Sequence, residues 1–308
     1  MSSSIKKYQC QPNILLNIAK MRFDNDGMQT IVVEGETDYR LFRQWLIERN
    51  ARIINVDGKS NVKEIWRKAK ERKFISIHCI ADLDFDLVLK DNPIIDDQFI
   101  YVSIKEGNSE SDIECNDLES ALIRSHSLTK VMSQKYRGLD LYQDFEVRIE
   151  KLREQLRIAA RNLGAYRAAD QLLFLTRKIS AIGGNFAINE DFYDSINVSV
   201  DSEKLSSLLR RGSNFSGYGI EEVISNATKL SNKYATGWQL CRGHDLTEML
   251  ALHVSNIVKR NVTVREIEED LRMACELEMI NSTRFGARLL NIGKVNGRPL
   301  LGLSPIVG

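Results

Sequence analysis

The chain has 308 residues, a formal net charge of +1 at pH 7 and a pI of about 7.6, with 43% hydrophobic and 28% charged residues. A chain of this length can bury a substantial core and is expected to form two domains. The composition excludes a disordered chain and a uniformly basic polyanion binder, so any nucleic-acid surface is expected to be a local patch.

Targeting and cysteine signals are absent from the sequence. No apolar run approaches the ~18–20 residues that span a bilayer, and the first residues lack the apolar core of a signal peptide. The five cysteines are far apart, with neither a Cys-x-x-Cys pair nor zinc-finger spacing. We therefore expect a cytoplasmic protein with reduced thiols and no membrane association.

The first hundred residues alternate between strand and helix patterns. Strands are predicted at 29–34, 52–56, 74–81 and 98–104, and amphipathic helices at 12–23, 37–49 and 61–72. Short apolar strands that alternate with helices are typical of an α/β domain. We expect a mostly parallel sheet with helices on both faces.

From about residue 126 helical periodicity dominates. Long helices are expected within 140–180, with Gly164 and the pair Gly183-Gly184 as breaks, and 185–200 is expected to be a loop with at most one short strand. Further helices are predicted at 202–211, 219–232, 244–259, 264–277 and 282–291. The expected fold class is α/β, with an N-terminal α/β domain over residues 1–130 and a mainly helical domain over 131–308.

Acidic residues come directly after two of the predicted strands. Glu34 ends the first strand, and Asp82, Asp84 and Asp86 follow the third. Sites in open α/β sheets lie at the carboxyl ends of strands, and on an extended segment the three aspartates would face the same way and repel one another without a cation. Mg²⁺ prefers such oxygen ligands. The alternatives are a helix-start acid at Glu34 and a solvated acidic loop.

These motifs carry a family resemblance. Val33-Glu34-Gly35-Glu36-Thr37-Asp38, followed by Ile80-Ala81-Asp82-Leu83-Asp84, resembles the Toprim domain of topoisomerases, bacterial primases and OLD-type nucleases. Asn116-Asp117-Leu118-Glu119 and Arg242-Gly243-His244-Asp245-Leu246 are similar to phrases in OLD-related Toprim effectors of PARIS-type anti-phage defence systems. The resemblance covers residues 29–125 and implies a Rossmann-like Toprim fold for the N-terminal domain.

The resemblance also implies an activity. It points to a nuclease dependent on Mg²⁺ or Mn²⁺, with Glu34, Asp82 and Asp84 as catalytic residues. The metal ligands it implies are Glu34, Asp38, Asp82, Asp84, Asp86 and Glu119. The implied target is RNA, including tRNA, with DNA left open. The implied context is a toxic defence effector that is controlled by an ABC-type ATPase partner and active as a homodimer.

Other activities fit the sequence less well. No tyrosine can be assigned as a topoisomerase nucleophile, and the zinc-binding and template-binding regions of primases are missing from the sequence. Hydrolysis by metal-activated water is the simpler chemistry. The alternative from another class is a non-catalytic Toprim-fold module that regulates or scaffolds an ATPase complex.

The helical half offers candidate phosphate contacts. Arg153, Arg157 and Arg161 recur every four residues and would line one face of a helix, where they could bind a phosphate backbone. The alternative is a solvated face paired with nearby glutamates. His244 could orient a phosphate, whereas Asp245 is the expected N-cap of the helix that follows.

Overall fold

The computed structural model describes residues 11–86, 88, 89, 94, 96–102, 116–136, 144–182, 187–212 and 218–302. The chain divides into two compact units. The sheet unit consists of Met1–Asp82, Ile94–Lys105 and Glu276–Gly308, and the helical unit of Leu83–Pro93 and Glu106–Cys275. This division differs from the single boundary expected near residue 130, because the C-terminal segment belongs with the N-terminal sheet.

The sheet unit contains four parallel strands in the order β2-β1-β3-β4. Their bounds are β1 (Gln29–Val33), β2 (Ala51–Asn55), β3 (Ile77–Asp82) and β4 (Phe99–Val102). All five residues of β1 are buried, as expected for a central strand covered on both faces. The predicted α/β class with a parallel sheet is confirmed for these residues, whereas 103 and 104, predicted to extend the last strand, lie outside the described residues.

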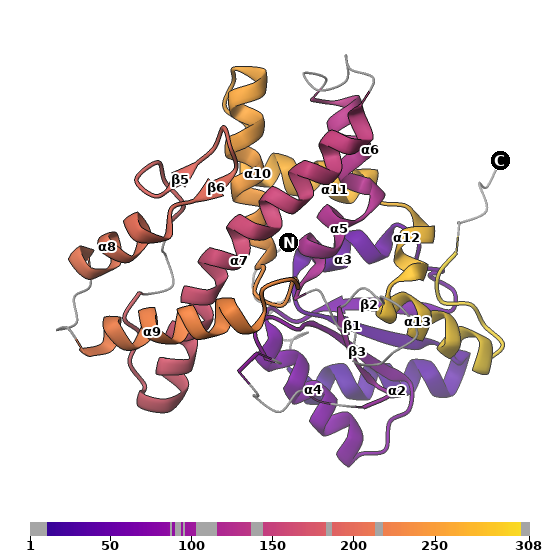
Figure 1. The fold of residues 1–308 in the computed structure, drawn as a ribbon. Helices are drawn as coiled ribbons and strands as arrows, with labels where there is room; N and C mark the ends of the chain where they lie inside the picture. Colours follow the sequence, from indigo (N-terminus) through magenta and orange to yellow (C-terminus); the bar gives the residue numbers. More distant parts are fainter. Residues whose placement is uncertain are drawn as a thin grey trace. The chain divides into compact units, whose positions relative to one another are not determined.

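Helices cover both faces of this sheet (Figure 1). Helices α2 (Pro12–Asp26) and α4 (Lys59–Glu71) pack against each other and against β1 and β3. Helix α3 (Glu36–Arg43) packs on β2, and α13 (Arg284–Val295), which follows α12 (Leu277–Ser282), packs on β4. The rings of Phe42 in α3 and Phe285 in α13 meet edge to face, with centroids 5.2 Å apart. The last helix of the described chain therefore completes the core of the sheet unit.

The helical unit is built around one long helix. In chain order its elements are α5 (Leu118–Arg124), α6 (His126–Gln134), α7 (Phe145–Arg177), β5 (Tyr193–Asp194), β6 (Ser199–Val200), α8 (Ser202–Gly212), α9 (Tyr218–Lys233), α10 (Gly243–Val258) and α11 (Val264–Ala274). The two short strands pair antiparallel where a loop with at most one strand was predicted. No helix of the described residues combines the length and apolar character needed to cross a membrane.

Gly164 does not break a helix, contrary to the prediction. It lies inside the 33-residue helix α7, and a Cβ atom there would stand 1.7 Å from the carbonyl oxygen of Leu240. The glycine thus permits close approach of two backbones within the helical unit. Gly183 and Gly184, the other predicted break, lie outside the described residues.

Replacement of Gly164 should destabilise the helical unit. We expect Gly164→Ala to lower the free energy of unfolding by about 2–3 kcal/mol, because α7 must move away from Leu240. Gly219→Ala is the matched control, since its Cβ would meet the nearest atom at 3.6 Å, and it should leave stability unchanged or raise it by up to about 1 kcal/mol. Urea unfolding of both variants tests the expectation, and equal midpoints would contradict it.

A buried histidine lies in the centre of the sheet. His78 in β3 is 5% exposed, and its Nε2 hydrogen bonds with Oε1 of Gln29 at 3.0 Å. Burial lowers the pKa of His78 from 6.5 to about 4. Between these pH values the unfolded chain binds a proton that the folded chain does not, so stability falls as pH is lowered through this window.

Acid should therefore destabilise the sheet unit through His78. Lowering the pH from 7 to 4.5 is expected to remove roughly 2–3 kcal/mol of unfolding free energy through this one residue. His78→Gln should show a pH dependence weaker by that amount in urea unfolding at the two pH values. His126→Gln, at an exposed histidine, is the control and should behave as the wild type. The same pH dependence in all three proteins would rule out the role of His78.

Candidate functional site

Two of the predicted catalytic acids meet at one edge of the sheet. Glu34 follows β1 directly and Asp82 ends β3, and these strands are parallel neighbours. The Asp82 backbone N–H donates a hydrogen bond of 2.7 Å to Oε1 of Glu34. The parallel topology thus places both residues at the carboxyl ends of adjacent strands, where α/β sheets carry their sites.

Asp38 has a local structural role. The Gly35 backbone N–H donates to Oδ2 of Asp38 at 2.9 Å, which forms half of a capping box at the start of α3. The helix-start interpretation considered for Glu34 therefore applies to Asp38. Its role as a metal ligand stays a prediction.

The segment after β3 is a turn and does not continue as an extended strand. Asp84 has a φ of 50°, and the Asn116 carbonyl accepts the N–H groups of Leu83 at 2.6 Å and Asp84 at 2.9 Å. Asp86, which is 5% exposed, donates its N–H to the Leu83 carbonyl at 3.1 Å. The expectation that three aspartates alternate along an extended segment is wrong, because one carbonyl captures two successive N–H groups and bends the chain.

Asp117 connects two helix starts within the helical unit. Its Oδ1 accepts the Ser120 N–H at 2.9 Å and caps α5, while its Oδ2 accepts the Gly243 N–H at 2.6 Å at the start of α10. A Cβ atom on Gly243 would lie 2.3 Å from the Asp117 carboxylate. Burial raises the pKa of Asp117 to about 6, with the nearby charge of Asp84 acting in the same direction and the N–H donors opposing it.

The motif that contains Asp117 and the motif that contains Gly243 are therefore in contact, although they are more than a hundred residues apart in the sequence. Sequence reasoning did not select Asp117. The signal that could have found it is an aspartate three residues before Ser120, the spacing of a capping box.

Glu119 takes part in a partly buried ion pair. Arg272, which is 8% exposed, donates from Nη1 to Oε1 of Glu119 at 3.0 Å and from Nη2 to Glu268 at 3.4 Å. This cation occupies one oxygen of the carboxylate that was predicted to bind metal. The pairing accounts for the acid at the start of α5 within the helical unit.

The donor chemistry at the strand ends suits a divalent cation. Glu34 and Asp82 offer carboxylate oxygens, and Mg²⁺ is usually held by one or two carboxylates, with water and substrate phosphate completing its coordination. Among the described residues, no group of three or more His, Cys, Asp or Glu side chains is placed to hold a metal ion. The pair is of the right chemical type for Mg²⁺ without forming a complete protein cage.

The predicted arginine face is largely turned into the helical unit. Arg153 donates to the carbonyls of Ile123 at 3.0 Å and Ser125 at 2.8 Å. Arg157 is 8% exposed, and it donates to Glu154 and to the Ala235 carbonyl. Arg161 also donates to Ala235.

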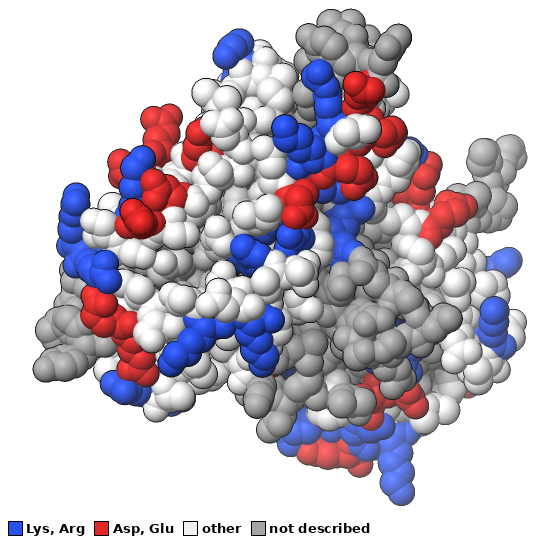
Figure 2. Space-filling model, viewed as in Figure 1, with Lys and Arg blue, Asp and Glu red and all other residues white. Residues whose placement is uncertain are grey.

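These contacts explain why the arginines do not form an exposed phosphate-binding ridge, as one interpretation of the sequence expected. Guanidinium groups carry five donors, and here they satisfy backbone carbonyls of neighbouring segments. The alternative interpretation, in which the arginines pair with nearby glutamates, applies to two of them. Glu150 pairs with Arg153, and Glu154 pairs with Arg157. Figure 2 shows acidic and basic side chains intermingled on the visible face.

Asp245 is not the N-cap that was predicted. It is fully buried inside the first turn of α10, and Arg167 donates from Nε to its Oδ2 at 2.8 Å. The neighbouring His244 is half exposed, and a hydrogen bond with Glu268 raises its pKa. The position that precedes the helix is occupied by Arg242.

The buried pair of Arg167 and Asp245 should be a strong stability determinant. We expect Arg167→Met to lower the unfolding free energy by about 3 kcal/mol or more, because it leaves the Asp245 carboxylate buried without its closest cation. Asp245→Asn in the same chain should restore part of this loss, which a double-mutant cycle by urea unfolding would measure. Strictly additive losses would show that the two side chains do not stabilise each other.

The sequence comparisons leave the family open. No protein-family model matches this chain, and no curated protein matches it. The likeness to Toprim proteins therefore depends on the motifs of residues 29–125 and on the Arg242–Leu246 phrase.

Proposed function

We propose that this chain is a Mg²⁺-dependent nuclease of the Toprim type that hydrolyses phosphodiester bonds. The observation that supports it most is the pair of Glu34 and Asp82 at the ends of adjacent parallel strands, joined by a 2.7 Å hydrogen bond. Asp84, two residues further along, is the third acid of the proposal. Such an edge combines carboxylates for metal binding with a carboxylate for proton transfer.

Each residue has a distinct part in this chemistry. Bound Mg²⁺ would polarise the phosphate and lower the pKa of water. Asp82 and Asp84 would hold the cation through their carboxylate oxygens. Glu34 would accept the proton of the attacking water, and the Asp82 N–H group that donates to its Oε1 would orient the carboxylate for this role. The turn at Asn116 fixes the backbone of Asp84.

The substrate and partner are proposed from the family resemblance. We propose RNA, including tRNA, as the target, and control by an ABC-type ATPase in a defence response that stops growth. The hydrogen bond from the Gly243 N–H group to Asp117 brings together the two sequence motifs on which this resemblance depends. The homodimer is part of the same proposal.

Substitution of the strand-end acids tests the proposal directly. Glu34→Gln and Asp82→Asn should each lower RNA cleavage by about 10²–10⁴-fold in Mg²⁺, as expected for loss of a proton acceptor or a metal ligand. Glu36→Gln is the matched control, since Glu36 is exposed and pairs with Arg40 at 3.1 Å, and it should cleave as the wild type. Full activity of a folded Glu34→Gln protein would refute the assigned role.

Calorimetry separates the nuclease from a non-catalytic module. The wild type should bind Mg²⁺ or Mn²⁺ and Asp82→Asn should not, whereas absence of metal binding to either protein would favour the non-catalytic module.

Sequencing of 5′ and 3′ ends of nucleic acids from cells that express wild type or Glu34→Ala would identify the nucleic acid that is cleaved. New ends confined to RNA in the wild type are expected.

A further inference from the structure

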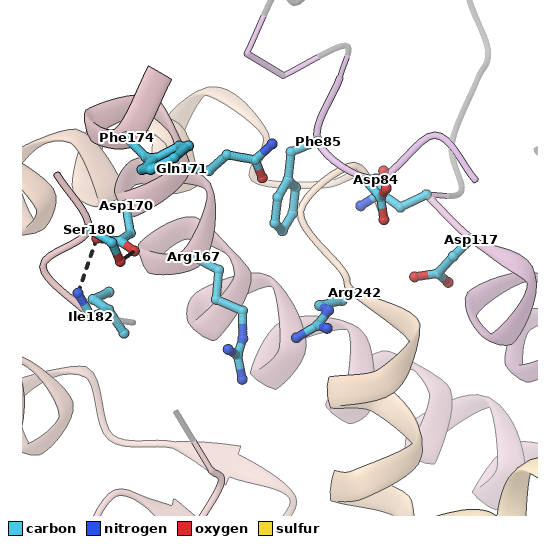
Figure 3. Close-up of a pocket in the computed structure, with 11 residues that line it drawn as sticks. Asp84, Phe85, Asp117, Arg167, Asp170, Gln171, Phe174, Ser180, Ile182 and Arg242 are labelled. Atoms are coloured by element: carbon cyan, nitrogen blue, oxygen red, sulfur yellow. Dashed lines mark hydrogen bonds between the residues drawn. The ribbon is translucent and has the colours of Figure 1, made fainter. Parts of the chain in front are cut away.

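A cavity in the helical unit is lined by side chains of opposite charge. Its volume is about 400 Å³, within the range of small-molecule sites. Its lining includes three acids, Asp84, Asp117 and Asp170, and the side chains of Arg167, Gln171, Phe174 and Arg242. Figure 3 shows the Asp84 and Asp117 carboxylates on one side and Arg242 extending toward α7 and Arg167 on the other.

Two of the acids are already committed to internal hydrogen bonds. Asp170 accepts from the hydroxyl of Ser180 at 2.6 Å and from the N–H groups of Ala181 at 2.6 Å and Ile182 at 3.1 Å. Asp117 accepts from two helix starts, as described above. Asp84 is the third acid of the cavity wall.

At the arginine end, two guanidinium groups approach the buried Asp245 carboxylate unequally. Arg167 donates to Oδ2 of this buried carboxylate at 2.8 Å, whereas Nη1 of Arg242 is 4.0 Å from Oδ1. Oδ1 has no hydrogen-bond partner within the described part of the chain. Arg242 is thus only weakly engaged, and its 41% exposed side chain can bind an anion at the cavity.

One face of α7 supplies another part of the cavity wall. Arg167, Gln171 and Phe174 are spaced four and three residues apart and so follow one another along the helix surface. Phe174 is 48% exposed, and the Lys178 ammonium lies 5.7 Å from the centroid of its ring. An exposed ring offers a stacking surface to a base, and the Gln171 amide can both donate to and accept from a base edge.

We propose that this cavity binds one unpaired nucleotide of the substrate strand, with its phosphate on Arg242 and its base on Phe174. Its volume suits a single nucleotide better than a helix or a strand of a protein partner. That the nucleotide belongs to a nucleic-acid strand rests on the proposed nuclease function. The ability of Arg242 to bind a phosphate and of Phe174 to stack on a base does not depend on that function.

Binding measured apart from cleavage tests the site. In the full chain with Glu34→Gln, fluorescence anisotropy would follow a fluorescein-labelled single-stranded RNA, and a DNA of the same sequence, in Mg²⁺. Arg242→Gln should weaken binding about tenfold or more. It should also lower the slope of log affinity against log salt concentration by about one, the value expected for the loss of one phosphate contact. Phe174→Ala should weaken binding about five- to tenfold, and Phe174→Trp should restore it.

Matched variants control for charge and apolar surface. Arg265→Gln, at an 81% exposed arginine, and Val147→Ala, at a 68% exposed valine of α7, should bind as the parent. Thermal unfolding of every variant checks the fold, and the exposed Phe174 provides a test even if Arg242→Gln unfolds.

The outcomes separate the site from the nuclease. Parent-like binding by folded Arg242→Gln and Phe174→Ala proteins, or no binding of either oligonucleotide by the parent, would overturn the site. If the wild type does not cleave but these variants lose affinity, the nuclease proposal fails and the site stands. If Glu34→Gln abolishes cleavage while the variants bind normally, the nuclease stands and the site fails.

Discussion

The architecture of the helical unit depends on the hydrogen bonds that Asn116 and Asp117 make to other segments of the chain. The Asn116 amide donates to the carbonyls of Gln239 at 2.6 Å and Cys241 at 3.2 Å, and its carbonyl accepts from Leu83 and Asp84. Asp117 links the starts of α5 and α10. A buried carboxylate is costly unless it is hydrogen-bonded, and the N–H groups of two helix starts, which carry partial positive charge, offset that cost. Two residues thereby fix the turn after β3, the segment before α10 and both helices.

The same logic, in which backbone donors hold a carboxylate, recurs at the edge of the sheet. Glu34 is positioned by an N–H group of β3, the strand next to the one it follows. Parallel strands that lie side by side end at the same edge, so apolar strands that terminate in acids bring those acids together without long-range side-chain recognition. The candidate catalytic pair is thus a direct consequence of strand order.

The arginines of the helical unit lie in two different environments. Arg153 and Arg157 share a face of α7 with a four-residue repeat, and both bond to backbone carbonyls inside the unit. Arg242 precedes a helix and stays partly exposed beside a cavity. Helical periodicity shows which residues share a face, but it contains no information on what that face meets. The carbonyls of Ser125 and Ala235 arrive there only through tertiary packing.

Local sequence patterns determined the four parallel strands, most of the helices and the placement of Glu34 and Asp82 at strand ends. The reason is that buried strands and amphipathic helices are recognised from the spacing of apolar residues that are near one another in the sequence. The tertiary structure alone decided that α13 completes the core of the sheet unit, that Gly164 lies against Leu240, that Asp84 is in a turn and that Asp245 is paired with Arg167. Each of these depends on a partner tens of residues or more away in sequence, whose approach no local pattern encodes.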